Sequence, residues 1–540
     1  MKPFPTAVLA SVLIVAWAPA QAPERFDLVV RGGIVVDGSG KPGAPADVAV
    51  RGDRIVAVGD LGVGVAARTI EAEGLVVAPG FVDVHTHADS DAVRLPLADN
   101  FVRMGVTSIV TGNCGSSVAA LGAHLARVEQ DGVSVNYGSL VGHGTVRTGI
   151  MRTAPRAPTA GELNRMKERV AAAMREGALG MSTGLIYVPG TYARTEELIE
   201  LAKVVAAHGG LYASHMRDEA GGVLASIDEA LRIGSEAGCR VHLSHLKASG
   251  RAVWGDGAKI AARLEQARRA GAQVTGDQYL YTASSTSLDV LFPSAELSVG
   301  RKEFVAKLGR DDAFRAAMVE AVLAGAKDAG FADLAYCQVA HAPGHAECNG
   351  QRLPQVALAL LGHDDPSAQA RAACRLFVDA EGRRVSMIYH KMAEEDVESI
   401  LRVPFVAVAS DAGIRSRSGD DRPHPRGAGN NARLLGRYVR ERRVVPLELA
   451  VQKMTSLPAD VFGLADRGRI APGQFADLVV FDPRRVADRA TYEDPRADPI
   501  GIPWVIVNGV VVVAEGEHTG AKPGMVLRGA GTRRSEAGGK

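Results

Sequence analysis

Residues 81–91, FVDVHTHADSD, place two histidines directly after a short apolar run. Side chains two residues apart in a β-strand point to the same face of the sheet. We therefore expect His85 and His87 to project together, an arrangement that suits one metal ion or one substrate. The alternative is two polar residues that merely end a strand, and the rest of the chain decides between these interpretations.

The region from residue 80 to residue 460 alternates short apolar runs with helical stretches such as GELNRMKERVAAAMREG. This alternation is typical of the α/β class, and eight such strands predict a (β/α)8 TIM-like barrel. The predicted strands span residues 80–84, 106–111, 137–141, 179–183, 211–214, 240–244, 273–277 and 404–410. The long gap between the last two strands predicts an inserted subdomain at about 287–392.

Both ends of the chain are rich in β-hairpin patterns. FDLVVRGGIVVDG predicts a turn at residues 32–33, and WVIVNGVVVVAEG predicts a type I′ turn at residues 508–509 because Asn-Gly favours that turn. The economical interpretation is one small β-sandwich domain built from residues 24–79 and 461–528.

The bulk composition narrows the class of protein. Of the 540 residues, 46% are hydrophobic and 23% are charged, which are ordinary globular values. The formal net charge of +1 and the aromatic content of 5% argue against a nucleic-acid partner.

The first twenty residues form a pattern of their own. Lys2 precedes the apolar run AVLASVLIVAWA, which leads into Ala18-Pro-Ala20, so residues 1–20 are predicted to be a secretory signal peptide. The run is too short for a comfortable membrane span. We expect a periplasmic or secreted protein that has no stable membrane insertion after cleavage, with a disordered tail at 529–540.

The cysteines are few and odd in number, which does not indicate a disulfide framework. The sequence leaves open whether Cys337 and Cys348 are bridged.

Polar residues with metal-binding or catalytic chemistry follow six of the predicted strands. In a (β/α)8 barrel the C-terminal strand ends share one face and carry the active site. These residues are His85 and His87, Cys114, His215, His245 with Lys247, Asp277 with Tyr279, and Asp411.

Histidine, cysteine and aspartate are ligands that suit Zn²⁺. Because the candidates come from distant segments, a catalytic zinc site with an open position fits better than a closed structural site. Zinc lowers the pKa of a bound water to about 7, and a neighbouring aspartate can accept its proton. The chemistry implied is metal-assisted hydrolysis, most naturally of an amide.

Longer stretches of the sequence carry a family resemblance. They are PGFVDVHTHADSD, TGNCGSS, GALGMSTGLIYVPGTYARTEEL, YASHMRDE, LSHLKASG, DQYLYTASST, RPHPRGAGNNARLLGRYVRE, KMTSLPADVFGL and RGRIAPGQFADLVVFDP. With them the chain resembles the amidohydrolase superfamily and, within it, the N-acyl-D-amino-acid deacylase (D-aminoacylase) family. This resemblance implies a zinc-dependent hydrolase that releases a carboxylic acid and a D-amino acid from a small-molecule N-acyl-D-amino acid.

The resemblance also implies a metal-ligand set. Cys114, His215 and His245 match the ligands of one tightly bound zinc. His85 and His87 match a second, weaker metal position or a partial ligand set.

The other implied roles concern the substrate. Asp411 matches the general base and acid, and Arg426, Lys247 and Tyr279 match the groups that grip the substrate carboxylate. Ser285 is a further candidate nearby.

Several alternatives remain open at this point. Tyr281 could exchange roles with Tyr279, and His143 either lines the pocket or hydrogen-bonds a loop. His242 is expected to face away from the site, and His341 and His345 are expected to be solvated. The stretch GALGMSTG is interpreted as close packing, because it lacks the lysine of a phosphate-binding loop.

The sequence also admits two rival functions. One is an amidase or dipeptidase that acts on D-residue-containing peptides, and the other is a non-catalytic zinc-binding protein. The resemblance alone implies the preference for D over L substrates.

Overall fold

The computed structural model describes residues 2, 4, 25–62 and 65–532. The predicted signal peptide falls almost wholly outside these residues, as does the predicted tail from residue 533 onward. Within the described part of the chain, no helix is both long enough and apolar enough to cross a membrane.

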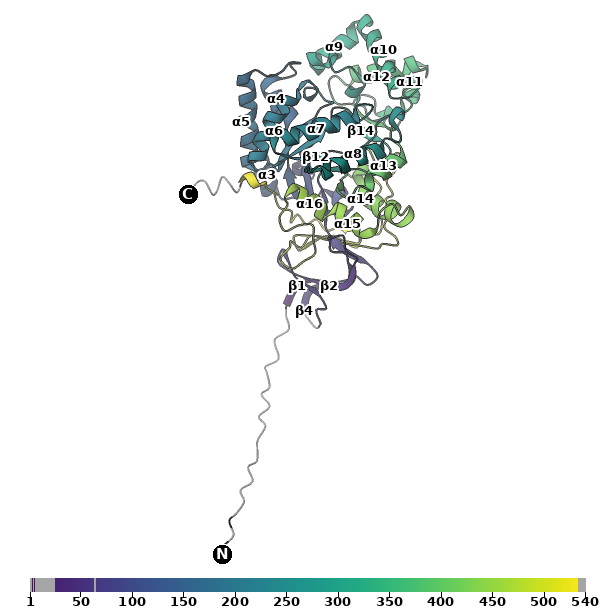
Figure 1. Ribbon diagram of the computed structural model, residues 1–540. Coiled ribbons are helices and arrows are strands. Elements are labelled where there is room, and N and C mark those ends of the chain that lie inside the picture. The colour runs from purple at the N-terminus through teal and green to yellow at the C-terminus, as the bar shows by residue number, and fades with distance from the viewer. Residues whose placement is uncertain (1, 3, 5–24, 63–64, 533–540) are drawn as a thin grey trace.

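One nine-stranded sheet is made from both ends of the chain. Its order is β21-β20-β19-β18-β5-β1-β2-β3, and β4 pairs with β1 off this path. The bounds are β1 (Arg25–Val35), β2 (Ala44–Arg51), β3 (Arg54–Gly59), β4 (Val65–Glu71), β5 (Val76–Pro79), β18 (Leu478–Phe481), β19 (Trp504–Val507), β20 (Val510–Ala514) and β21 (Glu517–His518). Strands β1, β2 and β4 lie at one end of the molecule (Figure 1).

The two turn predictions for this sheet have different outcomes. Asn508 and Gly509 have φ angles of 48° and 79°, as a type I′ turn between β19 and β20 requires. The predicted turn at residues 32–33 is wrong, because β1 runs through both glycines. Its pairing with β2 shifts register between Val30 and Gly33, so the glycines accommodate a bulge rather than a chain reversal.

The middle of the chain supplies parallel strands in two sheets. The first sheet has the order β17-β13-β12-β11-β10-β9, and the second has the order β6-β7-β8. The bounds are β6 (Phe81–Asp83), β7 (Val106–Thr111), β8 (Asn136–Ser139), β9 (Val141–Gly142), β10 (Gly180–Gly184), β11 (Leu211–His215), β12 (Arg240–Leu243), β13 (Val274–Gln278) and β17 (Val406–Val408).

The two parallel sheets meet at both edges. On one side, Leu179, which directly precedes β10, donates from its backbone N–H to Ser139 O at the end of β8 at 2.9 Å. On the other side, the Asp411 N–H donates to His85 O at 2.9 Å, and Thr86 forms a parallel bridge with Ala412. Apolar side chains of both sheets also form one buried cluster, which includes Val82, Val110, Leu140, Leu211 and Ala409.

Helices follow most of these strands. The longer ones are amphipathic and pack their apolar side chains into the main hydrophobic core. The bounds are α1 (Asp91–Arg94), α2 (Asp99–Val102), α3 (Leu121–Asp131), α4 (His143–Met151), α5 (Ala160–Glu176), α6 (Thr195–Ala207), α7 (Val223–Ala237), α8 (Gly257–Arg269), α13 (Glu394–Leu401), α14 (Arg426–Arg433), the π-helix η6 (Leu434–Glu441), α15 (Leu447–Met454) and α16 (Ser456–Phe462).

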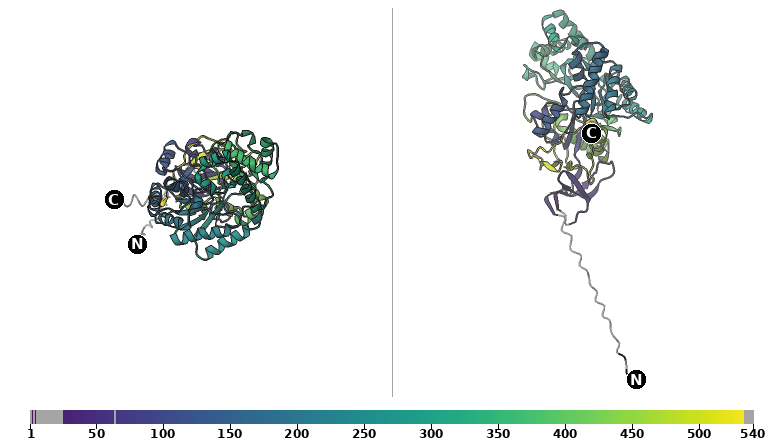
Figure 2. Two further views of the ribbon diagram at one scale, coloured as in Figure 1. Left: turned by 90° about the horizontal axis from the view of Figure 1, so that it is seen from above. Right: turned by 90° about the vertical axis from the view of Figure 1, so that its left-hand side faces the viewer.

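The segment between β13 and β17 contains its own small sheet, of order β14-β16-β15, and its own buried core. Its elements are β14 (Ser284–Ser287), α9 (Arg301–Arg310), α10 (Asp312–Asp328), β15 (Cys337–His341), α11 (Leu353–Leu361), α12 (Pro366–Asp379) and β16 (Ser386–Tyr389). Helices α9–α12 lie at the end of the molecule opposite β1, β2 and β4 (Figures 1 and 2). Cys337 and Cys348, both in this segment, are free thiols, so they form no bridge in the structure.

Candidate metal centre and active site

A cleft of about 1670 Å³ opens where the parallel strands end. Every predicted site residue except His85 lines it, and His85 lies fully buried directly behind His87 and Cys114. The segment between β13 and β17 contributes one wall through β14 and β16. The structure therefore brings all ten predicted residues to one place.

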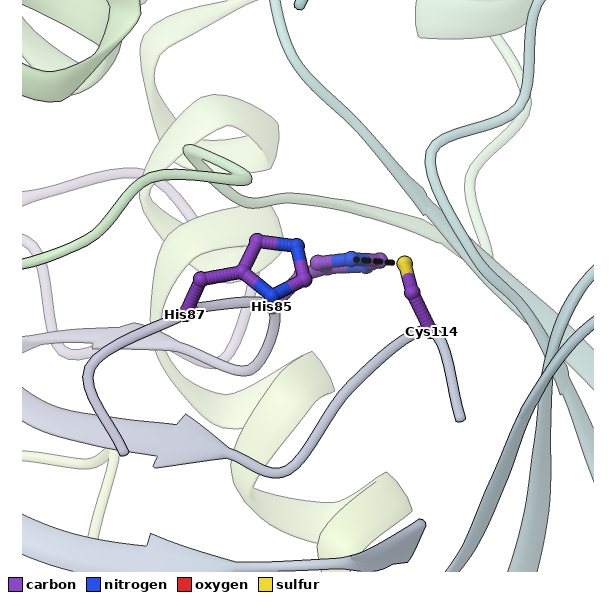
Figure 3. Close-up of side chains that lie close together, drawn as sticks. All are labelled: His85, His87 and Cys114. Atoms are coloured by element: carbon purple, nitrogen blue, oxygen red, sulfur yellow. Dashed lines mark hydrogen bonds between the residues drawn. The ribbon is translucent and has the colours of Figure 1, made fainter. Parts of the chain in front are cut away.

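Sulfur and imidazole nitrogens converge at the base of the cleft. Cys114 Sγ lies 3.3 Å from His85 Nε2 and 3.4 Å from His245 Nε2, and Figure 3 shows His85 and Cys114 directed toward each other beside His87. The ligand atoms of Cys114, His215 and His245 lie within 4.8 Å of one another, as do those of His85, His87 and Cys114. Thiolate and imidazole ligands of one tetrahedral zinc are separated by about 3.5 Å, given their usual bond lengths. The donor set thus fits a zinc ion.

His215 gives independent support for a bound cation. Its ring is buried, and neither ring nitrogen has a hydrogen-bond partner in the described chain. Buried polar atoms without partners are uncommon in native proteins and require an explanation. A metal ion held by His215 would satisfy one of these nitrogens.

The backbone at the site is unusual for residues other than glycine. Cys114, His245 and Asp411 have φ angles of 52°, 35° and 52°. Left-handed conformations of this kind are strained for L side chains by about 1–3 kcal/mol and concentrate at functional sites. Gly184 makes room for the Cys114 loop, because a Cβ at that position would lie 2.2 Å from Cys114 O. This agrees with the close-packing interpretation of GALGMSTG.

Two carboxylates orient the histidines, the buried Asp277 and the partly buried Glu219, which lines the cleft. Asp277 lies 3.1 Å from His85 Nδ1 and accepts from the His245 backbone N–H at 2.8 Å. Glu219 Oε1 lies 3.0 Å from His245 Nδ1 and accepts from Lys247 Nζ at 2.5 Å. Contacts of this kind fix the ring orientation of a metal-binding histidine.

Asp411 is held between cationic groups. His87 Nε2 lies 3.0 Å from its Oδ1, and Arg426 Nη1 lies 2.9 Å from its Oδ2. Burial alone would raise the pKa of Asp411, but Arg426 and then His85 outweigh it and hold this pKa well below its usual range. Asp411 is therefore ionised at neutral pH.

The thiol is also acidic. Burial would raise the pKa of Cys114, but the charges of His85 and His245 lower it well below the ordinary thiol value. The pKa of His87 is raised to about 9, because its contacts with Asp411 and Cys114 outweigh burial. Without a metal, Cys114 is thus already a thiolate, whereas His87 holds a proton that a cation can displace.

The predicted carboxylate-gripping residues lie on the neighbouring wall. The Arg426 guanidinium stands 4.4 Å from the centroid of the Tyr279 ring, and Lys247 Nζ stands 5.6 Å from it. Ser285 lines the same wall and donates its hydroxyl to Met387 O. Tyr279 lines the cleft, whereas the Tyr281 hydroxyl lies 3.3 Å from Asp488 and outside the cleft lining, so Tyr279 holds the predicted place.

The remaining histidines are also accounted for. His143 does not line the cleft, and its Nε2 lies 2.8 Å from Glu197 in α6. His341 lines the cleft, and His345 lies between Glu347 and Asp379, so the expectation that both are simply solvated is wrong. His242 faces away from the cleft but contacts Asp277 at 2.9 Å.

Sequence reasoning missed Glu219 and the relay from Asp277 to His242. Glu219 follows His215 by four residues in YASHMRDE, and this spacing is the signal that could have found it. The sequence marks Asp277 only as a strand-end residue, because its contacts join segments that sequence alone does not place side by side.

Comparison with known proteins defines the class. The model of the amidohydrolase family matches residues 68–285 and 309–513. An N-acyl-D-glutamate deacylase of Alcaligenes xylosoxydans xylosoxydans is 38% identical over 94% of this chain and 97% of its own length.

Two solved structures extend the likeness to three dimensions. One is N-acyl-D-glutamate deacylase from Bordetella bronchiseptica with zinc and a phosphonate mimic of the tetrahedral intermediate, at 36% identity and a TM-score of 0.80, covering 94% of this chain and all of the other. The other is a D-aminoacylase whose binuclear metal centre shows one-metal activation and second-metal attenuation, at 35% identity and a TM-score of 0.78, covering 93% of this chain and all of the other. The chain has the α/β amidohydrolase fold and belongs to the D-aminoacylase family of N-acyl-D-amino-acid deacylases.

Proposed function

We propose that this protein hydrolyses the amide bond of N-acyl-D-amino acids with the help of zinc, releasing a carboxylic acid and a free D-amino acid. The single observation that carries this proposal is the cleft, which unites a thiolate–imidazole donor set with an ionised Asp411. Its relatives include deacylases of this class and a zinc complex.

Cys114, His215 and His245 would hold one zinc tightly, and His85 and His87 a second, weaker one. When bound, zinc polarises the scissile carbonyl as a Lewis acid and lowers the pKa of a water molecule. Two observations support this assignment, namely the acidic Cys114 thiol and the unpartnered ring nitrogens of His215.

Asp411 acts as general base and then as general acid. Its ionised carboxylate faces the donor set, so it can accept a proton from the attacking water and pass it to the departing amine. The contact with Arg426 fixes one carboxylate oxygen, and His87 lies against the other. A carboxylate held at both oxygens needs little reorganisation when the proton moves.

Arg426, Lys247, Tyr279 and Ser285 bind the α-carboxylate of the substrate. Arginine holds a carboxylate through a rigid fork of donors, and lysine adds a point charge. Because the grip fixes the α-carbon relative to Asp411, it is the element of the site that could select one configuration at that carbon.

The size of the cleft supports a second candidate function. Pockets for small ligands usually occupy about 300–1,000 Å³, and this cleft is larger at about 1670 Å³. An amidase or dipeptidase that acts on D-residue-containing peptides would use the same chemistry on a longer substrate.

The test is primary-amine release by zinc-loaded protein from matched N-acetyl-D- and N-acetyl-L-amino acids, with Asp411→Asn as the control. Turnover of the D forms, lost in the variant while zinc is retained, supports the deacylase. Turnover only of D-residue peptides would favour the second candidate. Zinc binding without any turnover would indicate a non-catalytic protein.

We further propose that the two parallel sheets form one closed (β/α)8 barrel spanning residues 80–460, with an insertion at about 287–392. The hydrogen bonds at both sheet edges and the shared apolar cluster support closure. The nine-stranded sheet would then represent a composite β domain of residues 24–79 and 461–528. Limited proteolysis that releases the insertion and leaves the rest intact would support this division.

We also propose that residues 1–20 direct export to the periplasm or beyond. The support is their composition, a lysine followed by an apolar run and a small-residue cleavage pattern. The N-terminus of the exported protein is expected at Gln21, and peptide mass spectrometry checks this. A mature protein that retains Lys2 would contradict it.

A further inference from the structure

Three cations that line the cleft, Lys391, Arg384 and Arg415, make no ion pair in the described part of the chain, and Lys391 adjoins the proposed carboxylate grip. Lys391 follows β16 and lines the cleft, yet its Nζ makes no hydrogen bond and no ion pair with any residue in the described ranges. By contrast, Arg426 is paired with Asp411 and Lys247 is paired with Glu219.

The backbone of Lys391 is fixed in place. Its carbonyl accepts from the Gly250 N–H at 2.8 Å and from Trp254 Nε1 at 3.1 Å. Its Nζ stands 5.4 Å from the centroid of the Tyr389 ring, at the favourable range for a cation and an aromatic face. The ammonium is therefore presented by a held segment rather than by a loose loop.

The position of Lys391 is next to the proposed carboxylate grip. The adjacent Met392 receives the Tyr279 hydroxyl at its sulfur, 3.8 Å away, and donates from its backbone N–H to Thr282 O. Lys247, Tyr279 and Met392 line the same small pocket. Lys391 is therefore one residue away from a side chain that contacts the grip.

The charges around Lys391 compensate it only in part. Burial lowers its pKa and so does the Lys247 charge, whereas Glu219, Cys337 and Asp218 act in the opposite direction without an ion pair to Nζ. Glu219 is already engaged by Lys247 Nζ and lies beside His245 Nδ1. A half-buried charge without a partner is unfavourable, and such groups at a cleft are candidates for binding an external ion.

We propose that Lys391 receives a second carboxylate of the substrate, carried on the side chain of the acylated D-amino acid. The inference rests on the proposed function and deepens it: the preferred substrates are N-acyl derivatives of acidic D-amino acids. Lys391 is then a specificity-determining residue, separate from the α-carboxylate grip and from the metal ligands.

The experiment compares kcat/KM for N-acetyl-D-glutamate with N-acetyl-D-glutamine, and for the aspartate and asparagine pair. The neutral member of each pair has nearly the same shape, so the ratio isolates the second charge. Zinc-loaded wild type is compared with Lys391→Met. Arg384→Met is the control for charge, because Arg384 lies before the other end of β16, also lines the cleft and is also without an ion pair among the described residues, although it is more exposed than Lys391.

We expect wild type to prefer one acidic substrate over its neutral partner by about 10- to 100-fold, the value of a hydrogen bond to a charged group. In Lys391→Met this ratio falls toward one, because turnover of the acidic substrate drops more than that of the neutral substrate. In Arg384→Met the ratio stays high, which excludes a general effect of positive charge in the cleft.

Three results would overturn the inference. They are a wild-type ratio near one, an unchanged ratio in Lys391→Met, and an equal loss for both substrates in that variant, which would indicate a structural role. If no N-acyl-D-amino acid is turned over, the proposed function fails on its own. In that case, calorimetry measures the affinities of wild type and Lys391→Met for N-acetyl-D-glutamate and N-acetyl-D-glutamine. A preference for the acidic ligand that is lost in Lys391→Met supports the inference, and an unchanged preference overturns it.

Discussion

Replacement of Asp277 by asparagine is the sharpest test of how the metal centre is built. This carboxylate is almost fully buried and contacts His85 Nδ1 at 3.1 Å, His242 Nε2 at 2.9 Å and the His245 N–H at 2.8 Å. It does not line the cleft, so any effect must pass through the histidines. Asparagine keeps the size of the side chain but removes its charge and half of its acceptors.

The magnitude follows from these contacts. Loss of an outer contact to a metal-binding histidine lowers metal affinity about 10- to 100-fold, or roughly 1.4–2.7 kcal/mol. For Asp277→Ala, a buried charged network is broken, and the free energy of unfolding should fall by about 3–5 kcal/mol. The conservative variant thus separates an effect on the metal from an effect on folding.

The assay is competition for zinc between the folded protein and a chelating dye, with urea unfolding of the metal-free protein alongside. Asp477→Asn is the matched control, because Asp477 is equally buried but bonds Arg467 and Asn508 far from the cleft. We expect the control to lose stability and keep its zinc affinity. A folded Asp277→Asn protein that binds zinc within about threefold of wild type would refute the argument that this carboxylate orients His85.

Three further predictions concern other groups. In metal-free protein, iodoacetamide at neutral pH should alkylate Cys114 selectively, because the pKa of Cys114 is lowered while burial raises the pKa of the other four cysteines. Zinc should protect Cys114 from alkylation. Peptide mass spectrometry measures the labelling, and equal labelling of Cys239 would contradict the prediction. Arg426→Lys should lower kcat/KM by about 10- to 100-fold, because lysine cannot reproduce two charge-assisted hydrogen bonds. Steady-state kinetics measure this loss, and a loss below about twofold would argue against the assigned role of Arg426 in binding the α-carboxylate. Burial lowers the pKa of Lys453 from 10.5 to about 7. Between these two pH values the unfolded chain therefore carries one more proton than the folded chain. The free energy of unfolding then rises by up to about 1.4 kcal/mol per pH unit. Urea unfolding at about pH 7.5 and pH 9.5 should show wild type gaining stability relative to Lys453→Met, and a pH-independent difference would speak against a neutral lysine in the folded state.

The central strands could be predicted because their chemistry is local. Apolar runs bounded by polar residues mark β6, β7, β11 and β12 within one or two residues, and the site residues follow them in the sequence. The Asn508-Gly509 turn was predictable for the same reason, since two neighbouring residues determine it. The proximity of the site residues was also predictable, because the carboxyl ends of parallel strands lie at one edge of the sheet.

Other features depend on contacts that the sequence does not order. The left-handed backbone at Cys114 and Asp411 has no residue signature, because strain at these positions is sustained by the surrounding packing. Whether Lys391 has an ion-pair partner depends on the positions of all nearby carboxylates, and the sequence does not give these positions. Gly-Gly at residues 32–33 fits a turn and a bulge equally well locally, and only the partner strand β2 decides.

The nine-stranded sheet has a consequence for the order in which the chain can fold. Strand β5 pairs with β18 in antiparallel register, and about 400 residues separate these partners. At ~5–20 residues per second, synthesis of the intervening chain takes roughly 20–80 s, during which one edge of β5 stays open. A chain truncated before residue 478 never closes that edge. The sheet can therefore be completed only after translation has reached its C-terminal strands. An unfinished chain exposes a strand edge, which favours aggregation or degradation.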